Sequence, residues 1–202
     1  MNQNDSMDNA ARVLGADDDD ATRLLVCAAL EQAGFHVRDV ADGAAALATF
    51  SEFRPGVVLL DVVMPKMDGY DACAAIRALP AGANVPVLML TGLDDVESIN
   101  RAYVAGATDF ATKPINWIVL GHRVRYMLRT KQAFDELRES EARLATAQHI
   151  AQMGHWNWDA HTARLHWSAE VYRLFGIIPG DIGPTYERFL DLVHPDDRTA
   201  VA

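Results

Sequence analysis

Residues 57–65 have the sequence VVLLDVVMP, which places one carboxylate, Asp61, between two apolar runs. The branched residues from Val57 to Leu60 are typical of a strand that is buried on both faces of a sheet. A carboxylate at the end of such a strand is costly in free energy unless it has a partner. In open α/β sheets, ligands bind at the carboxyl ends of the strands. Asp61 is therefore the first candidate for a functional residue.

The segments on either side of this strand alternate between strand and helix patterns. Apolar runs predict further strands at residues 12–16, 36–40, 85–90 and 109–112. Helical periodicity predicts helices at 22–33, 43–52, 70–79 and 94–105, the last capped by Asp94 or Asp95, and another helix from Trp117. This alternation predicts an α/β fold, a doubly wound five-stranded parallel sheet with helices on both faces.

Composition narrows the classes of function. The chain has 202 residues, 50% of them hydrophobic, and a formal net charge of -10 without a basic tract. We therefore expect no nucleic-acid partner, because binding phosphates requires clustered Lys and Arg. No apolar run approaches the ~20 residues of a membrane span, and residues 1–10 predict a disordered polar tail. Cys27 and Cys73 lie in helix patterns, so we expect a reducing, cytoplasmic location without membrane association.

The first predicted strand is followed by four consecutive aspartates, Asp17 to Asp20. A helix cap accounts for Asp19 or Asp20, because Asp favours the start of a helix. The ends of the first and third strands are neighbours in such a sheet, so Asp17 and Asp18 are expected near Asp61. Clustered carboxylates repel one another unless a cation is present, and a site of few oxygen ligands suits Mg²⁺. The run predicts a magnesium site, with a plain helix cap as the alternative.

Two further strand ends carry residues that suit a phosphoryl group. Thr91 and Gly92 follow the fourth apolar run, and Lys113 follows the fifth. A hydroxyl, an accessible backbone amide and an ammonium group beside a Mg²⁺-bound carboxylate could hold a transferred phosphoryl group. Their position at successive strand ends predicts a phosphoryl site around Asp61.

Residues 12–129 resemble a response-regulator receiver domain of two-component signalling. The matching residues are Asp17-Asp18, Asp61, Met64-Pro65-Lys66-Met67-Asp68-Gly69, Thr91-Gly92, Gly106-Ala107 and Lys113-Pro114. The resemblance implies the strand order 2-1-3-4-5 and a cis peptide bond between Lys113 and Pro114. It also implies that Asp61 is a phosphoacceptor, with a histidine kinase or a phosphotransfer protein as its partner.

The same resemblance implies a role for each residue of the site. Asp18, Asp61 and the Val63 carbonyl would bind Mg²⁺ directly, and Asp17 would bind it through water. Thr91 and Lys113 would hold the phosphoryl oxygens, together with the backbone of Val62 and Gly92. Phe110 occupies the position of the aromatic switch, which packs inward when Thr91 moves toward the phosphate.

The chain departs from the family pattern at two places. Gly15-Ala16 replace branched apolar residues at the end of the first strand, so looser packing is expected there. Val63 and Leu93 stand where side chains often influence hydrolysis, and neither can orient a water molecule. These two residues predict a long-lived aspartyl phosphate.

The last receiver helix has no obvious stop. Proline and glycine are absent from Arg123 to Met153, which predicts a helix of ~35 residues, spanning roughly 50 Å. Phe134, Leu137 and Leu144 fall on positions resembling a coiled-coil seam, which Glu141 interrupts. They favour parallel pairing with a second chain, and an amphipathic helix lying on its own domain is the alternative. An ion pair between Glu139 and Arg143 is expected on this helix.

The C-terminal segment resembles the first half of a PAS sensory domain. The matching stretches are 138–144, 154–158, 167–168, 172–176 and 193–198. Strands at Trp156–Trp158 and Arg164–Trp167 are expected around a turn at 159–162, with Ser168 capping a helix at 169–175. Trp156 and Trp158 share one face of a strand, most simply the core face. The spacing of His155, His161, His166 and His194 fits no metal site, so solvated or hydrogen-bonded histidines are expected.

Together these patterns predict a tail at 1–10, a receiver domain at 11–130, a helical linker at 131–150 and the N-terminal part of a PAS domain at 151–202. The leading hypothesis is a phosphorelay switch, homodimeric through the last receiver helix and linker, with any output enzyme outside this chain. A phosphatase of the haloacid-dehalogenase type is disfavoured, because it places a second Asp where Val63 stands. A dimerisation or ligand-sensing module that acts without phosphorylation is the other alternative.

Overall fold

The structure is a computed structural model, and it describes residues 11–92, 96–159, 162, 164–178 and 185–201. The chain divides into two compact units, with the boundary between Phe134 and Asp135. Several sequence predictions lie outside the described residues: the tail at 1–10, Leu93, the candidate caps Asp94 and Asp95, and His161.

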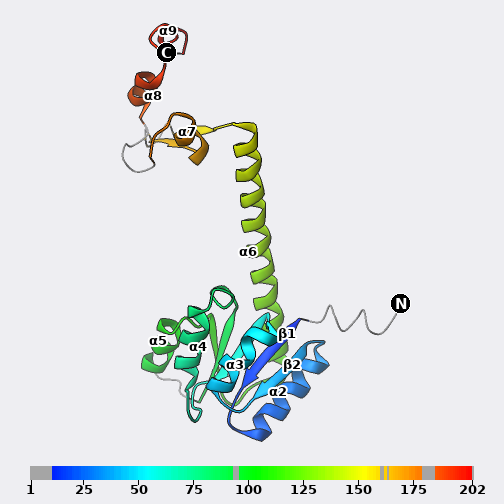
Figure 1. The fold of residues 1–202 in the computed structure, drawn as a ribbon. Helices are drawn as coiled ribbons and strands as arrows, with labels where there is room; N and C mark the ends of the chain where they lie inside the picture. The colour runs from blue at the N-terminus through cyan, green and yellow to red at the C-terminus, as the bar shows by residue number, and fades with distance from the viewer. Residues whose placement is uncertain (1–10, 93–95, 160–161, 163, 179–184, 202) are drawn as a thin grey trace, which may run out of the picture. The chain divides into compact units, whose positions relative to one another are not determined.

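A five-stranded parallel sheet forms the centre of the first unit (Figure 1). Its strands are β1 (Arg12–Ala16), β2 (His36–Val40), β3 (Val57–Asp61), β4 (Val87–Thr91) and β5 (Asp109–Thr112). Their order, β2-β1-β3-β4-β5, confirms the predicted fold class. The register pairs Ala16 with Leu60, Asp61 with Leu90 and Thr91 with Thr112. The carboxyl ends of β1, β3, β4 and β5 therefore lie at the same edge of the sheet.

Helices cover both faces of this sheet. They are α2 (Asp20–Gln32), α3 (Gly43–Phe53), α4 (Gly69–Ala78), α5 (Val96–Val104) and the first part of α6 (Trp117–Ala151). One core joins the sheet to α3, α4 and α5, and it includes Phe50 and Ile76. The other core joins the sheet to α2 and α6, and it includes Leu30 and Val124. The central strand β3 is buried along its whole length, as its apolar sequence predicts.

The ends of these elements follow local chemistry. Asp19 accepts a hydrogen bond from the Thr22 backbone N–H at 3.0 Å, so α2 begins at Asp20 and not at Thr22 as predicted. Strand β4 begins at Val87 and not at Val85, because Pro86 has no N–H for the ladder. The Lys113–Pro114 peptide bond is cis, as the resemblance implies.

A small cavity lies beside β1. Its volume is ≈ 10 Å³, and its walls include Gly15, Ala16, Val26 and Leu59. A Cβ atom added to Gly15 would meet Val26 Cγ1 at 3.9 Å as its nearest neighbour. The looser packing expected at Gly15-Ala16 is therefore present.

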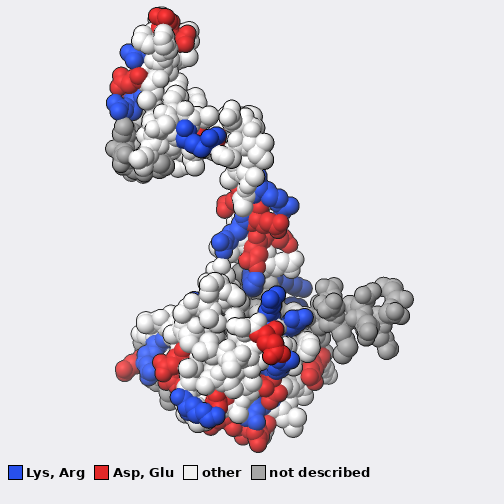
Figure 2. All heavy atoms as spheres, viewed as in Figure 1, with Lys and Arg blue, Asp and Glu red and all other residues white. Residues whose placement is uncertain are grey.

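The long helix α6 has two different halves. Leu120, Val124 and Met127 are buried in the first unit. Beyond them, the side chains of Phe134, Leu137 and Leu144 are 54%, 56% and 59% exposed. Acidic and basic side chains mix along this exposed stretch (Figure 2), and the predicted pair of Arg143 with Glu139 is present at 3.8 Å.

The second unit contains a two-stranded antiparallel sheet and short helices. The strands are β6 (Trp156–Asp159) and β7 (Arg164–Trp167), followed by α7 (Ala169–Leu174), α8 (Tyr186–Leu192) and α9 (Arg198–Val201). Ser168 stands at the N-cap of α7, but its side chain makes no cap hydrogen bond. Its hydroxyl instead accepts from the His155 backbone N–H at 3.0 Å, so the predicted N-cap position is confirmed and the capping hydrogen bond is absent.

The expectation that Trp156 and Trp158 face a core is also wrong. Their side chains are 63% and 45% exposed, whereas Trp167 on the paired strand is 4% exposed. Trp156 lines a hollow of ≈ 320 Å³ together with Trp167 and Phe189. Among the described residues of the second unit, α8 and α9 line this hollow and give the face only partial cover.

The end of α6 is tied to α7. Glu170, whose side chain is 8% exposed, accepts hydrogen bonds from Arg173 and pairs with His149 Nδ1 at 3.2 Å. A Cβ atom added to Gly154 would lie 2.4 Å from Val171 Cγ2, so only glycine permits this close approach. These contacts hold the last turn of α6 and the residues that follow it against α7, within the second unit.

Among the described residues, no helix is both long enough and apolar enough to cross a membrane.

Candidate functional site

The candidate site lies at the carboxyl edge of the parallel sheet. Asp61 and Thr91 are the last residues of β3 and β4, while Asp17 and Lys113 directly follow β1 and β5. Parallel strands bring these ends to the same edge. Asp17, Asp61 and Thr91 are 3%, 5% and 4% exposed, which is unusual for polar side chains and shows that the fold encloses them.

The charged groups of this edge form one cluster. Each of Asp17, Asp18 and Asp61 offers a carboxylate oxygen, and these oxygens lie within 4.8 Å of one another. Lys113 Nζ contacts Asp61 Oδ1 at 2.7 Å and Asp17 Oδ2 at 2.9 Å. The structure therefore brings together four of the residues that the sequence selected, from three different strand ends.

These contacts shift the pKa values of the central pair. Burial raises the pKa of Asp61, and the charges of Asp17 and Asp18 add to this rise, while the Lys113 ammonium opposes it. For Lys113, burial lowers the pKa, but its hydrogen bonds to Asp61 and Asp17 outweigh burial and leave it raised. The Lys113 ammonium therefore stabilises the ionised Asp61 carboxylate, whose burial would otherwise cost free energy.

Each of the four consecutive aspartates makes different contacts. Asp17 accepts from Lys113 and from the Asp19 backbone N–H at 2.9 Å. Asp18 is exposed beside the cluster, Asp19 caps α2, and Asp20 pairs with Arg23. The helix-cap prediction is therefore confirmed for Asp19, and Asp17 and the exposed Asp18 lie in the cluster with Asp61.

The donor set fits a hard divalent cation. Three carboxylates at one lip, two of them buried, carry more negative charge than the single Lys113 ammonium balances. Oxygen ligands of this number leave room for the water molecules that Mg²⁺ retains. Asp17, Asp18 and Asp61 are the residues that would hold such an ion.

The turn after Asp61 approaches the strand closely. The Gly69 N–H donates to the Val62 carbonyl at 3.0 Å, and a Cβ atom on Gly69 would lie 2.2 Å from the Asp61 carbonyl oxygen. The Val62 N–H donates to the Leu90 carbonyl at 3.0 Å. This bond engages the amide that was predicted to contact a phosphoryl group, so the geometry counts against that role for Val62 in this state.

Other predicted residues lie at the margin of the site. Val63 is 66% exposed and its side chain has no hydrogen-bonding atom. A Cβ atom on Gly92 would meet nothing within 4 Å, so space adjoins that backbone. Phe110 is half-buried and meets Tyr103 edge to face, with the ring centroids 6.1 Å apart.

Sequence reasoning missed an ion pair that ties down the loop after Asp61. Lys66 has a positive φ of 66°, and its Nζ contacts Asp42 Oδ2 at 2.6 Å. Asp42 also caps α3 through the Ala45 N–H. An Asp-Gly pair before a predicted helix signals such a cap, but no local pattern connects it to Lys66, which lies 24 residues away.

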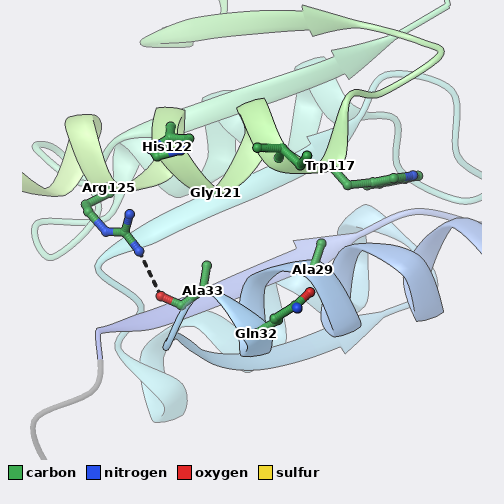
Figure 3. A pocket seen from close by; sticks show the side chains of 8 residues that line it. Ala29, Gln32, Ala33, Trp117, Gly121, His122 and Arg125 are labelled. Atoms are coloured by element: carbon green, nitrogen blue, oxygen red, sulfur yellow. Dashed lines mark hydrogen bonds between the residues drawn. The ribbon is translucent and has the colours of Figure 1, made fainter.

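A separate hollow of ≈ 330 Å³ lies between α2 and α6 (Figure 3). Small residues, Ala29, Ala33 and Gly121, leave this space, and Trp117 and Arg125 bound it. Arg125 Nη2 donates to the Ala33 carbonyl at 2.9 Å across it. None of the clustered carboxylates lines this hollow, so it is distinct from the candidate site.

Comparison with known proteins identifies the family. The model of the response regulator receiver domain matches residues 13–125, more than half of the chain. The chain belongs to the response regulator receiver family. A model of the PAS fold matches residues 164–202, in agreement with the second resemblance.

Curated relatives share the receiver region. The response regulator PleD of Caulobacter vibrioides is 39% identical over 133 residues, which cover 66% of this chain and 29% of that protein. The DNA-binding dual master transcriptional regulator RpaA of Synechocystis is 37% identical over 118 residues, 58% of this chain and 49% of that protein. The chain thus spans half or less of the length of these relatives.

Solved structures confirm the fold. The chemotaxis protein CheY4 of Vibrio cholerae is 34% identical, with a TM-score of 0.57, over 58% of this chain and 98% of that chain. The receiver domain of the sensor histidine kinase PA1611 of Pseudomonas aeruginosa is 28% identical, with a TM-score of 0.56, over 59% of this chain and 98% of that chain. That structure has a magnesium ion coordinated in its active site cleft.

Proposed function

We propose that this receiver accepts a phosphoryl group on Asp61 from the phosphohistidine of a kinase or phosphotransfer protein. The observation that carries the proposal is the enclosed cluster at the sheet edge. Asp61 lies there with Lys113 Nζ at 2.7 Å and with the oxygens of Asp17 and Asp18 within 4.8 Å. A cytoplasmic location stays a prediction from the sequence.

The chemistry is a displacement at phosphorus. An Asp61 carboxylate oxygen attacks the phosphorus atom, the bond from phosphorus to the partner's histidine nitrogen breaks, and the electron pair stays on that nitrogen. Lys113 shifts from its contact with the carboxylates toward the transferred oxygens, and the Thr91 hydroxyl donates to another of them. The chain's contribution is position and charge, which is typical of phosphoryl transfer.

The metal ligands are the acidic residues of the cluster. Asp18 and Asp61 would hold Mg²⁺ directly with the Val63 carbonyl, and Asp17 would hold it through water. Bound there, the ion would neutralise charge on the phosphoryl oxygens. The donor set of three carboxylates supports this assignment, and the magnesium ion in the PA1611 receiver domain is consistent with it.

Transmission would start at β5. Phe110 contacts Tyr103 of α5, and its carbonyl accepts from Arg123 Nη1 of α6 at 2.9 Å. A change at Thr91 that draws Phe110 inward would therefore act on both helices. We propose that α6 passes this change to the PAS segment and to downstream output, and that the exposed residues of α6 pair with a second copy.

Intact-mass measurement tests the acceptor directly. The full chain is incubated with acetyl phosphate and Mg²⁺, and a single phosphate adduct is expected. Asp61→Asn should abolish the adduct, because the amide is not a nucleophile for phosphorus. Asp71→Asn is the matched control, since Asp71 is an exposed carboxylate on α4 and should leave the adduct unchanged.

Two outcomes would contradict the proposal. An adduct that persists in Asp61→Asn would place the phosphate elsewhere. No adduct in the wild type, with the chain folded and Mg²⁺ present, would favour the alternative of a dimerisation or ligand-sensing module that acts without phosphorylation. The exposed apolar residues of α6 and β6 support this alternative, because they could contact a second copy or a ligand.

A further inference from the structure

Arg23 reaches back from the first turns of α2 to the segment that carries the acidic cluster. Its Nη1 donates to the main-chain carbonyl of Asp17 at 2.8 Å, and its Nε donates to Asp39 Oδ2 at 3.1 Å. Its Nη2 contacts the Asp20 carboxylate. The side chain is 17% exposed, so a charged group is held in place by three directed contacts.

These contacts fix the loop between β1 and α2 from two sides. The Asp17 N–H donates to the Val40 carbonyl at 3.2 Å, and the Asp17 carbonyl accepts from Arg23. Asp39 belongs to β2 and pairs in register with Gly15 of β1. Both main-chain polar groups of Asp17 are thus anchored to β2. Its N–H bonds to β2 directly, and its carbonyl bonds to the Arg23 guanidinium, which also binds Asp39 of β2.

This anchoring matters because the packing behind the loop is loose. Arg23, Asp17 and Asp39 line the ≈ 10 Å³ cavity beside Gly15. Side chains therefore leave some of the space behind the loop unfilled. The position of Asp17 and Asp18 relative to Asp61 depends on hydrogen bonds, and Arg23 supplies the side-chain bond to the Asp17 main chain.

We propose that Arg23 is a positioning residue for the divalent cation, which holds Asp17 and Asp18 in the geometry that binds the ion. The proposal rests on the proposed function, because it takes the carboxylate cluster as a Mg²⁺ site. Arg23 does not itself touch the ion or the phosphoryl group. It acts through the main chain of Asp17.

Two effects of removing Arg23 have opposite signs. Loss of a cation beside the acidic loop would strengthen cation binding by electrostatic attraction alone. Loss of the anchor would weaken binding, because ligands that move must be ordered again when the ion binds. The proposal requires that the second effect dominates.

Isothermal titration of the full chain with Mg²⁺ separates these effects without using phosphoryl transfer. Arg23→Gln should weaken Mg²⁺ binding about tenfold, since losing a group that orients metal ligands typically costs 10–100-fold in affinity. Arg23→Lys should also weaken it, by about fivefold, because an ammonium keeps the charge but lacks the planar fork that reaches three partners. Thermal unfolding confirms that each variant is folded.

Arg38→Gln is the matched control. Arg38 lies on the same strand as Asp39, is half-exposed, and contacts Glu52 at 3.4 Å and the Phe53 ring at 4.7 Å. The substitution removes the same charge without a contact to the acidic loop, so Mg²⁺ affinity should stay within about twofold, as for a screened surface charge.

The outcomes assign success and failure separately. Wild-type affinity in both Arg23 variants, or tighter binding in Arg23→Gln, would overturn the positioning role while leaving the proposed function intact. A wild-type chain that binds no Mg²⁺ and gains no phosphate adduct would overturn the proposed function itself. Weakened binding in Arg23→Gln and Arg23→Lys, with Arg38→Gln unchanged, supports the positioning role.

Discussion

Replacing Gly15 with alanine should stabilise the receiver unit. Gly15 lies in β1 beside the ≈ 10 Å³ cavity, and its φ is outside the left-handed region that favours glycine. The added methyl group would meet its nearest neighbour, Val26 Cγ1, at 3.9 Å, which is ordinary van der Waals contact. The folded state therefore accepts the methyl group without rearrangement.

Two contributions set the magnitude. Alanine restricts the unfolded chain more than glycine does, which stabilises a compatible site by about 0.4–1 kcal/mol. Burying one methyl group adds up to about 0.8 kcal/mol, less what imperfect filling of the cavity loses. The sum is roughly 1 kcal/mol, which corresponds to an upward shift in Tm of about 4 °C for a domain of this size.

Hydrogen exchange measured by mass spectrometry assays this change within the full chain. Exchange of the buried β3 amides requires global opening of the receiver unit, so it should slow about fivefold for 1 kcal/mol of added stability. Gly69→Ala is a control that should destabilise the receiver unit. Its Cβ would lie 2.2 Å from the Asp61 carbonyl oxygen, so the backbone would have to move. That variant should exchange faster than the wild type.

Gly15→Val extends the test. A branched side chain exceeds the cavity, and overpacking typically costs 1–3 kcal/mol, so valine should not exceed alanine in stability. If Gly15→Ala leaves exchange of β3 unchanged or faster, the cavity beside β1 does not limit stability. The reasoning from its size and neighbours would then be wrong.

Three further predictions concern function, pH and assembly. Val63→Asn should speed the loss of phosphate from Asp61, followed by intact mass over time, because an amide can orient water; an unchanged or already rapid decay would refute the slow-switch hypothesis. Hydrogen bonds with Arg173 and, to a smaller extent, His149 lower the pKa of Glu170 from 4.5 to about 2, although burial alone would raise it. The stability that Glu170 adds is therefore complete above pH 4.5 and lost as the pH falls toward 2, so the difference between wild type and Glu170→Gln in denaturant unfolding should shrink over that window; a constant difference would contradict the assignment. Leu137→Glu should weaken self-association measured by analytical ultracentrifugation, whereas Ala145→Glu on the same helix should have less effect; equal effects would argue against a seam at Leu137.

The sequence predicted the sheet and its functional edge because both depend on short-range patterns. Runs such as Val57–Leu60 mark buried strands, and the alternation with helices leaves few topologies. Strand order then brings Asp17, Asp61, Thr91 and Lys113 to one edge without any knowledge of side-chain conformation. This is why the residues of the candidate site could be chosen before their distances were known.

Contacts made by long side chains were not predictable in this way. Arg77 on α4 donates to the Gly106 carbonyl at 2.8 Å and to the Gly82 carbonyl at 2.8 Å, and so links the two loops that contain these glycines. Arg23 and Lys66 likewise find partners 16 and 24 residues away. Arg and Lys are compatible with many surface positions, so their identity in a sequence does not say which backbone group they meet. The separate partners of Asp17 to Asp20 could likewise be assigned only from the structure.

The second half of α6 is where local pattern and observed packing differ most. Phe134, Leu137 and Leu144 fall on positions resembling a coiled-coil seam, which Glu141 interrupts, yet each is more than half exposed within this chain. Most of the stability of helices in proteins comes from packing of an apolar face and not from helical propensity. Ion pairs such as Glu139 with Arg143 add only about 0.2–0.5 kcal/mol each. Burial of these apolar residues against a second copy would stabilise the second half of α6. It would also join two receivers through one paired helix. A switch at Asp61 would then act on a helix whose stability depends on pairing, which is why self-association and phosphorylation should be measured together.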